Sequence, residues 1–330
     1  FMKSLIQKLV ETTSPSGYEA AIRAVVRAEV EPLADEVRVD ALGNLIVRKG
    51  QGGHKIMLSA HVDEIGVIIT HIEETGYLRF TGIGGVYPVH CVGGRVRFLS
   101  GQVGVIYAER GEDRSRVPGL DQMYIDVGAA NRKECPVRVG DVAAFDRTFE
   151  DLGNKLVSKA MDNRISAAVL IETLRQLKST PHELYFVFST QEEVGLRGAT
   201  TAAFGIDPDL AVAVDVTGSG DTPKGYKMAV ALGKGPAVKV RDGGMLSDPR
   251  VVTWMSQIAE KAHIPYQLEV LEFGTTDARA IQVTRAGVPS GCLSIPCRYI
   301  HSPSEMVDFR DVQNGVRLLV DMLSQPVEWL

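Results

Sequence analysis

The apolar residues of the chain follow helical and strand patterns in turn, starting with two helices. Residues 3–31 repeat apolar positions every three to four residues, which predicts two amphipathic helices separated by the segment SPSGYE. Ser16 in this segment is a favourable N-cap residue, and we expect it to cap the second helix. The runs EVRVD, NLIVRK and KIMLSA then predict strands. The last run is almost wholly apolar, as expected for a strand covered on both faces.

The middle of the chain has a different pattern. From about Gly66 to Phe149, short β runs are punctuated by glycines, and helical periodicity appears only around DQMYIDVGA at 121–129. Such a texture predicts a small β-rich unit. After Leu152, helical and strand patterns alternate again. We expect helices at 162–178, 248–263, 277–285 and 308–324, and strands at 183–190, 210–216, 266–271 and 290–294.

Strands that alternate with helices predict an α/β fold. We therefore expect an α/β three-layer sandwich with a mixed sheet, interrupted by an inserted small β-barrel domain. One domain would combine residues 1–65 and 157–330, and residues 66–156 would form the insertion. The sequence contains no internal repeat and no low-complexity linker that would suggest a different division.

Composition and charge argue against several classes of partner. The 330 residues carry a net charge of −5 without a long run of Lys or Arg, which disfavours a nucleic-acid partner. No apolar run reaches the ~18–20 residues that span a bilayer, and the first residues lack the apolar core of a signal peptide. We therefore expect no membrane contact and a cytoplasmic location. The four cysteines form no CxxC pair, which indicates neither a disulfide framework nor a thiolate metal site.

Acidic and imidazole side chains follow three of the predicted strands. KIMLSA leads into His61 and Asp63, LYFVFST into Glu192 and Glu193, and LAVAV into Asp215. In open α/β sheets, ligands bind beyond the carboxyl ends of the strands. We therefore expect these side chains to lie together at one edge of the sheet.

Two further candidates, Asp162 and His301, lie on connections. Asp162 begins the helix predicted at 162–178, and His301 follows the strand predicted at 290–294. Two imidazoles and several carboxylates with almost no basic neighbours would form an acidic pocket that is unstable without a cation. Mixed His, Asp and Glu ligation suits Zn²⁺, with Co²⁺ or Mn²⁺ as alternatives, and five ligands match two ions that share one carboxylate. The sequence thus predicts a dinuclear metal site.

Each of these motifs is weak by itself. A histidine beside an aspartate at a strand end is commonly structural, adjacent glutamates are often solvated, and an acid at a helix start is often a cap. Their coincidence at one edge favours the metal site. The other histidines lack such company and are expected to be surface or structural residues: His54, His71, His90, His182 and His263.

Other chemistries find less support in the sequence. No GxSxG elbow is present, and the cysteines lack the local signatures of thiol proteases. The glycine-rich segments GIGG at 82–85 and TGSGD at 217–221 match neither the dinucleotide fingerprint nor the phosphate loop. We expect both to be turns.

Six segments together resemble the M42 metallo-aminopeptidases, the family of the tetrahedral, dodecameric TET peptidases. They cover nearly the whole chain in the family's order: AHVDEIG, SKAMDNR, STQEEVGLRGA, AVDVTGSGD, FGTTDA and RYIHSPSEM. The resemblance implies that residues 1–65 and 157–330 form a catalytic peptidase domain and that the insertion at 66–156 is a PDZ-like dimerisation domain. It also implies a homo-oligomer in which dimers assemble into a tetrahedral dodecamer.

The same resemblance implies two divalent metal ions per subunit and a set of ligands for each. The first ion would be held by His61, Asp162 and Asp215, and the second by Asp162, Glu193 and His301. Asp162 would bridge the two ions.

Two carboxylates would complete the catalytic machinery by resemblance. Asp63 would orient His61, and Glu192 would be the general base. The family often has a second aspartate after the bridging one, where this chain has Asn163. That difference implies only a modest change in local electrostatics.

We therefore expect a dinuclear metallo-aminopeptidase that acts on short peptides with free N-termini. The ions would activate a bridging water while a carboxylate moves its proton to the leaving amine. A related zinc deacylase or carboxypeptidase is an alternative, because Arg164, Arg279 and Arg298 lie near the motifs and would suit a substrate carboxylate. A glycosidase built on paired carboxylates and a non-catalytic assembly protein with a structural metal are alternatives from other classes.

Overall fold

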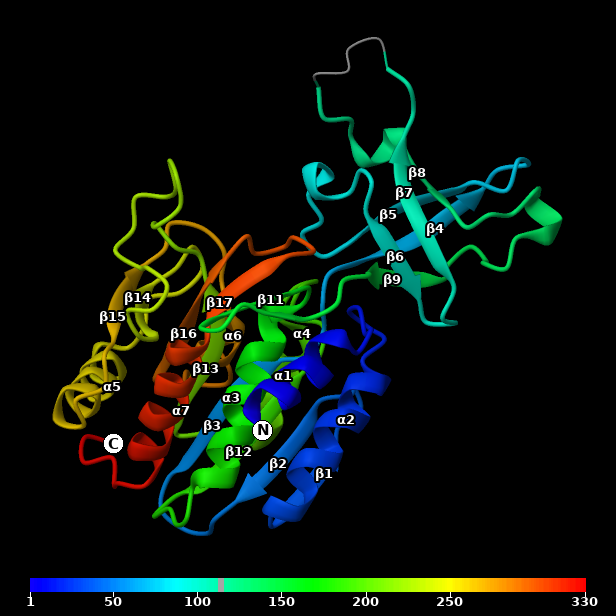
Figure 1. The fold of residues 1–330 in the computed structure, drawn as a ribbon. Helices are drawn as coiled ribbons and strands as arrows, with labels where there is room; N and C mark the ends of the chain where they lie inside the picture. Colours follow the sequence, from blue (N-terminus) through cyan, green and yellow to red (C-terminus); the bar gives the residue numbers. More distant parts are fainter. Residues whose placement is uncertain (112–115) are drawn as a thin grey trace.

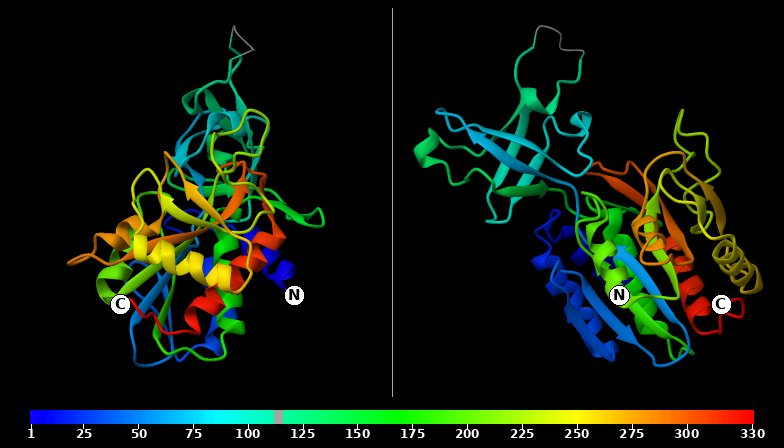
Figure 2. Two further views of the ribbon diagram at one scale, coloured as in Figure 1. Left: turned by 90° about the vertical axis from the view of Figure 1, so that its left-hand side faces the viewer. Right: turned by 180° about the vertical axis from the view of Figure 1, so that it is seen from behind.

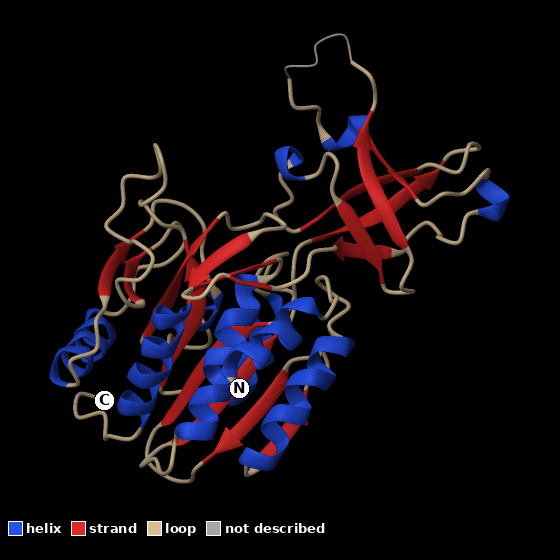
Figure 3. Cartoon of the chain, in the orientation of Figure 1, coloured by secondary structure: helices blue, strands red, loops and turns tan. Residues whose placement is uncertain are grey.

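The computed structural model describes residues 1–111 and 116–330, and residues 112–115, inside the predicted insertion, lie outside the described part of the chain. The helices are α1 (Met2–Glu11), α2 (Ala20–Val30), α3 (Met161–Gln176), α4 (Arg197–Ile206), α5 (Pro249–Lys261), α6 (Asp277–Gln282) and α7 (Phe309–Leu323). Short 3-10 turns are η1 (Glu31–Leu33), η2 (Pro88–His90), η3 (Leu120–Gln122) and η4 (Arg132–Glu134). Figures 1 and 3 show two bodies, a helix-covered sheet and a smaller β unit that projects from one end of it.

The larger body is built on an 11-stranded mixed sheet. Its strands are β1 (Glu36–Val39), β2 (Leu45–Lys49), β3 (Lys55–His61), β10 (Glu150–Asp151), β11 (Lys155–Ser158), β12 (Glu183–Ser189), β13 (Leu210–Thr217), β14 (Ala237–Arg241), β15 (Gln267–Val270), β16 (Ser290–Arg298) and β17 (Glu305–Asp308). The neighbours β12, β3, β13 and β16 run parallel, and antiparallel strands flank them. The predicted mixed α/β architecture is confirmed.

Helices cover both faces of this sheet because its central strands are apolar on both sides. Ile56 and Leu58 of β3 belong to a core shared with α1, α2, α3, α5 and α7, whereas Met57 between them packs into a second core with α4 and α6. Successive strand residues point to opposite faces, so this alternation divides β3 between the two layers of helices. In Figure 1, α1, α3 and α7 lie on the near face.

The smaller body is a closed antiparallel barrel with its own core. Its strands are β4 (Gly66–Ile72), β5 (Leu78–Ile83), β6 (Arg95–Phe98), β7 (Val103–Ala108), β8 (Met123–Asp126) and β9 (Val142–Phe145), in the order β4-β5-β8-β7-β6-β9. Both views in Figure 2 show it standing away from the helical layers. The predicted small β-barrel is confirmed, and the strands β10 and β11 that follow it already pair in the large sheet.

The helical periodicity around 121–129 does not produce a regular helix. Only η3 is helical there, and β8 follows it directly. Met123 and Ile125 are buried in the barrel core, while Asp126 is exposed. This alternation with period two is the pattern of a strand that is half buried.

Ser16 does not cap α2, because its hydroxyl is used elsewhere. The helix begins at Ala20 with Glu19 as its N-cap residue. The hydroxyl of Ser16 instead donates a hydrogen bond to Oδ2 of Asp63 at 2.6 Å. The segment between α1 and α2 is thereby tied to the carboxyl end of β3.

Arg164 ties the first helix to α3 from inside the protein. Its guanidinium is fully buried and donates to the backbone carbonyls of Leu9, Thr12 and Ser14 at 2.8, 3.0 and 3.3 Å. A buried charge is tolerated only where hydrogen bonds replace its hydration. Arg164 is therefore a structural residue and is not available to bind a substrate carboxylate.

Among the described residues, no helix is long and apolar enough to cross a membrane.

Candidate metal centre

The carboxyl ends of three adjacent parallel strands converge at the end of the sheet that faces the barrel. β3 lies between β12 and β13 and ends at His61, with Asp63 just beyond it. β12 leads into Glu192 and Glu193, and β13 carries Asp215. The structure thus places all five side chains expected at strand ends near one edge.

Asp162 and His301 reach the same edge from connecting segments. Asp162 is the second residue of α3, but its backbone is extended, with φ −75° and ψ 105°, so the regular helix begins after Asn163. His301 lies in the turn between β16 and β17. Asp162 thus joins the strand-end groups from the start of α3, and His301 joins them from the β16–β17 turn.

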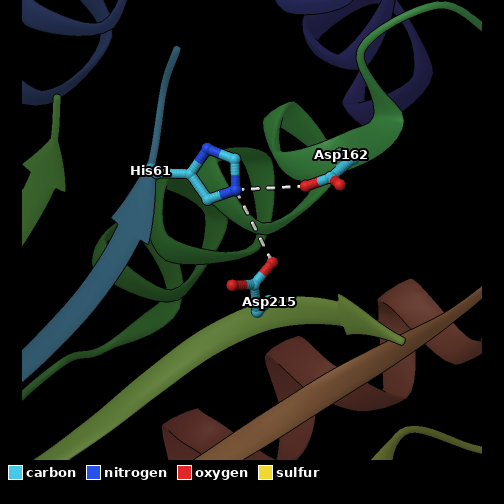
Figure 4. A group of neighbouring side chains, drawn as sticks. All are labelled: His61, Asp162 and Asp215. Carbon is cyan, nitrogen blue, oxygen red and sulfur yellow. Dashed lines mark hydrogen bonds and ion pairs between the residues drawn. The ribbon is translucent and has the colours of Figure 1, made fainter. Parts of the chain in front are cut away.

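His61, Asp162 and Asp215 form a first group of possible ligands. Nε2 of His61 lies 3.1 Å from Oδ1 of Asp162 and 3.8 Å from Oδ1 of Asp215 (Figure 4). All three side chains are buried. A tetrahedral Zn²⁺ with bonds of about 2.0–2.1 Å places its ligand atoms roughly 3.3 Å apart, so this spacing matches one ion.

Asp162, Glu193 and His301 form a second group. Nε2 of His301 lies 3.1 Å from Oε2 of Glu193 and 3.4 Å from Oδ2 of Asp162. Asp162 therefore presents Oδ1 to one imidazole and Oδ2 to the other. A carboxylate with this orientation has one oxygen for each of two ions.

Glu192 belongs to neither group, although it is adjacent to Glu193. Its Oε2 lies 3.8 Å from Nε2 of His61, and its side chain lines a cavity above the site. The chain has already left β12 at this point, so the two neighbours diverge in the turn that follows the strand. One glutamate thus faces the second ligand group and the other faces the space between the groups and the cavity.

Asp63 supports this turn with both carboxylate oxygens. Oδ1 accepts the backbone N–H of Glu192 at 3.0 Å, and Oδ2 accepts the backbone N–H of Glu193 at 3.1 Å. Oδ1 also lies 3.5 Å from Nδ1 of His61. Burial alone would raise the pKa of Asp63, but its hydrogen bonds from His61 and Ser16 lower it. The carboxylate is therefore an acceptor for several donors at once.

The site gathers more negative charge than its two imidazoles balance. Burial raises the pKa of both Glu192 and Asp215 well above their ordinary range, and the neighbouring carboxylates raise them further. Burial opposes protonation of His301, yet hydrogen bonds to Asp162 and Glu193 raise its pKa to about 12. The carboxylates of the site repel one another, and a divalent cation would stabilise them in their charged form. The donor set and its spacing therefore suit metal ions.

Glu305 supports the site, although the sequence pattern does not single it out. Its buried carboxylate accepts the backbone N–H of Asp162 through Oε2 at 2.9 Å and that of His301 through Oε1 at 2.8 Å. It thereby fixes the main chain of two residues from the second group. The only signal in the sequence is an acid four residues after His301, which by itself is a common arrangement.

A cavity of about 1170 Å³ opens over the two groups. Sheet loops supply much of its lining, and the barrel contributes Tyr87, Val89 and His90. His90 lines this cavity but belongs to neither ligand group. The cavity is lined further by Thr217, Gly218, Ser219, Thr222, Tyr226, Lys239, Leu271, Phe273, Arg279 and Arg298.

The basic residues of the lining differ in their pairing. Arg298 donates two hydrogen bonds to Asp221, at 3.0 and 2.8 Å, and Lys239 is buried against Glu269. Arg279 also lines the cavity and is exposed. Two of the three cations are thus neutralised by acids of the protein itself.

The comparisons with known proteins agree with this geometry. A model of the M42 glutamyl aminopeptidase family matches residues 43–318. The lysyl aminopeptidase of Pyrococcus furiosus is 37% identical over 336 residues, covering 97% of this chain and 96% of that protein. Among solved structures, the aminopeptidase APDkam598 from the archaeon Desulfurococcus kamchatkensis has a TM-score of 0.96 at 41% identity, covering 99% and 96% of the chains. The TET1 peptidase of Pyrococcus horikoshii, which can assemble into a tetrahedron or a large octahedral shell, has a TM-score of 0.89 at 32% identity, covering 98% and 100%.

Proposed function

Because the chain belongs to the M42 glutamyl aminopeptidase family, we propose that it is a metal-dependent aminopeptidase that removes N-terminal residues from short peptides. The observation that carries this proposal is the carboxylate of Asp162, whose two oxygens face two separate ligand groups below a cavity. Ligand pockets for small molecules usually occupy about 300–1,000 Å³, so the cavity has room for a short peptide.

Two divalent ions per subunit would occupy the site, with Zn²⁺ the best match to the donors and Co²⁺ or Mn²⁺ as alternatives. The first ion would be held by His61, Asp162 and Asp215, and the second by Asp162, Glu193 and His301. When bound, the ions would polarise the scissile carbonyl and lower the pKa of an attacking water. The remaining steps fall to side chains that hold no ion.

Glu192 would be the general base. Its carboxylate faces the space between the first ligand group and the cavity, where it would accept a proton at Oε2 and pass it to the nitrogen of the leaving amine. Asp63 would act as a positioning residue, because it orients His61 and holds the backbone of the turn that carries Glu192. Its own oxygens are occupied by these donors.

The barrel would be the domain through which subunits assemble. We assign residues 66–156 to a PDZ-like dimerisation domain and residues 1–65 and 157–330 to the catalytic domain, with dimers assembling into a tetrahedral dodecamer. The tetrahedral assembly of the related Pyrococcus horikoshii peptidase supports this assignment. Light scattering of the intact chain measures the assembly directly.

A paired substitution tests the catalytic roles. Glu192→Gln should lose roughly 10²–10⁴-fold in kcat while both ions stay bound, because the amide keeps the size of the side chain but cannot accept the proton. Glu193→Gln should instead lower the affinity for one ion, and activity should be partly recovered at high metal concentration. Reversed phenotypes would refute the two roles, and a fully active Glu192→Gln would refute the hydrolytic mechanism.

Substrate comparisons separate the remaining alternatives. A free peptide should be hydrolysed and its N-acetylated form should not, whereas a deacylase or carboxypeptidase would accept the blocked form. Removal of metal with a chelator should abolish turnover and re-addition should restore it. Chelator-resistant cleavage of a glycoside would point to a glycosidase, and tight metal binding without any turnover would point to a structural metal.

A further inference from the structure

A short segment of the barrel, residues 84–90, lies against the metal centre. It begins directly after β5 ends at Ile83 and includes η2. Its first two residues, Gly84 and Gly85, belong to the GIGG motif that the sequence suggested to be a simple turn. Their neighbours are two of the ligand-type residues, which gives the motif a different meaning.

Gly85 packs against the imidazole of His301 so closely that no side chain fits between them. A Cβ atom at Gly85 would lie 2.4 Å from Nδ1 and 2.7 Å from Cε1 of His301. Its backbone is outside the left-handed region, so alanine would meet no conformational penalty there. The glycine is required for close approach alone. The backbone at Gly85 therefore supports the Nδ1–Cε1 edge of the ring, which adjoins Nε2.

Gly84 makes a similar approach to Glu193. A Cβ atom there would lie 3.1 Å from Cβ and 3.3 Å from Oε2 of Glu193, and 3.0 Å from Cγ2 of Ile65. Here the backbone also has φ +75°, a conformation that glycine adopts at low cost. The two consecutive glycines thus contact two members of the second ligand group, one each.

Tyr87 adds an aromatic contact to the same imidazole. The rings of Tyr87 and His301 have centroids 6.1 Å apart and are inclined by 35°. Tyr87 and the neighbouring Val89 also line the cavity above the metal centre. The segment therefore borders the imidazole with both backbone and side chain.

The chain that enters the barrel is anchored to the same region by Glu64. Glu64, directly after Asp63, pairs with Nζ of Lys159 at 2.6 Å, and both side chains are buried. Oε1 of Glu64 also accepts the backbone N–H of Ser14 at 2.8 Å. Separating such a buried pair is costly, because each partner would be left as an uncompensated buried charge. The base of the barrel is thus held beside the segment that leads into Asp162.

We propose that Gly84 and Gly85 are positioning residues of the second ligand group, so that the docked barrel completes the site for one of the two ions. The inference rests on the proposed function for the role of the ions, but its evidence is the steric contact with Glu193 and His301. A barrel whose 84–90 segment moves away would leave His301 and Glu193 without support on that side.

The test is Gly85→Ala, with Gly111→Ala as the matched control. Gly111 is also a glycine of the barrel, and a Cβ atom there meets no atom of the described residues within 4 Å. Because the new methyl group displaces His301, Gly85→Ala should lower the affinity for one ion by about 10–100-fold. This is the usual effect of disturbing a residue that supports a metal ligand. Elemental analysis after dialysis against graded metal buffers measures this directly. Gly111→Ala should retain both ions with unchanged affinity.

A double variant guards against a general packing defect. His301→Ala removes the imidazole that the new methyl group would strike, so Gly85→Ala added to His301→Ala should cause no further loss of thermal stability or of metal. Equal destabilisation with and without the imidazole would overturn the inference, as would two tightly bound ions in Gly85→Ala. A protein without peptidase activity that still loses one ion on Gly85→Ala would refute the proposed function and leave this inference standing.

Discussion

Oδ2 of Asp63 accepts the backbone N–H of Glu193 at 3.1 Å, although its other oxygen faces the imidazole of His61. The two side chains belong to different ligand groups, so one carboxylate connects both groups. Asp63 itself is 0% exposed and touches no solvent. Removal of its charge should therefore affect both groups.

Asp63→Asn should lower the affinity of both ligand groups for their ions. Asparagine keeps the size of the side chain, but its amide nitrogen cannot accept the backbone N–H that Asp63 now holds. We expect a 10–100-fold loss of affinity for the ions, measured by metal titration of the metal-free protein. Asp242→Asn is the control, because Asp242 is equally buried and also accepts backbone N–H groups, from Gly244 and Met245. If Asp63→Asn and the control have the same metal affinity, the link that Asp63 makes between the two ligand groups does not contribute to metal binding.

Asp162→Asn should lose affinity for two ions, whereas His301→Ala should lose only one. The single carbonyl oxygen of asparagine has no charge and can face only one of the two imidazoles. Elemental analysis after dialysis counts the ions in each variant. Two tightly bound ions in Asp162→Asn would show that the carboxylate does not bridge the groups.

The buried pair of Lys239 and Glu269 is expected to matter for stability. Nζ of Lys239 lies 2.5 Å from Oε1 of Glu269, which also accepts the hydroxyl of Thr217 at 2.6 Å, and all three residues are buried. Lys239→Met leaves a buried carboxylate without its cation and should lower the free energy of unfolding by about 3–5 kcal/mol in urea titrations. The double variant Lys239→Met/Glu269→Gln should recover most of this loss. A double variant as unstable as the single one would contradict the explanation.

An exposed pair offers the comparison for this experiment. Arg27 and Glu31 are 3.4 Å apart on the surface, with both side chains largely in solvent. Arg27→Met should change the free energy of unfolding little, because exposed ion pairs contribute little to stability.

Asp308 should make the protein sensitive to acid. Burial acts to raise its pKa, but hydrogen bonds from Arg310 and Lys155 outweigh burial and lower the pKa to about 2. The ordinary pKa of aspartate is ~3.9, so the unfolded chain takes up this proton first as the pH falls. The stabilisation is complete above about pH 4 and is lost as the pH falls toward 2. It amounts to about 2 kcal/mol.

The variant Asp308→Asn isolates this effect. Asn can still cap α7, as Asp308 does through the backbone N–H of Arg310, but it carries no charge. The unfolding free energy of the variant should therefore depend less on pH between 4 and 2 than that of the parent chain. Parallel curves for the two proteins would show that Asp308 does not contribute to acid unfolding.

Much of the candidate metal site can be predicted from the sequence because parallel strands share one edge. His61 and Asp215 lie at the ends of apolar runs that have the pattern of buried strands, and adjacent parallel strands bring their carboxyl-terminal residues to the same place. The ordering of Glu192 and Glu193 was not predictable in this way. The two diverge in a turn, where strand periodicity no longer applies, and only the family resemblance supplied their roles.

The supporting residues were invisible for a different reason. Glu305 acts by accepting the backbone N–H groups of Asp162 and His301, and every residue except proline has such a group. Gly85 acts by leaving space for the imidazole of His301. Neither action leaves a local signal, because both depend on how separate segments meet at the edge of the sheet. The strand β8 was hard to recognise in the sequence because its buried alternation covers only Met123 and Ile125, too few positions to establish a period of two.

The position of the barrel in the chain also bears on how the protein folds. His61 and Asp162 lie 3.1 Å apart but are separated by 101 positions in sequence, most of them in the barrel. Within the barrel, β4 pairs with β9, which sets Gly66 beside Ala144. A barrel that folds early thus shortens the loop between His61 and Asp162, which lowers the entropic cost of closing it by on the order of 1 kcal/mol. We therefore expect the insertion to speed the meeting of these two side chains, because it brings its own ends together first.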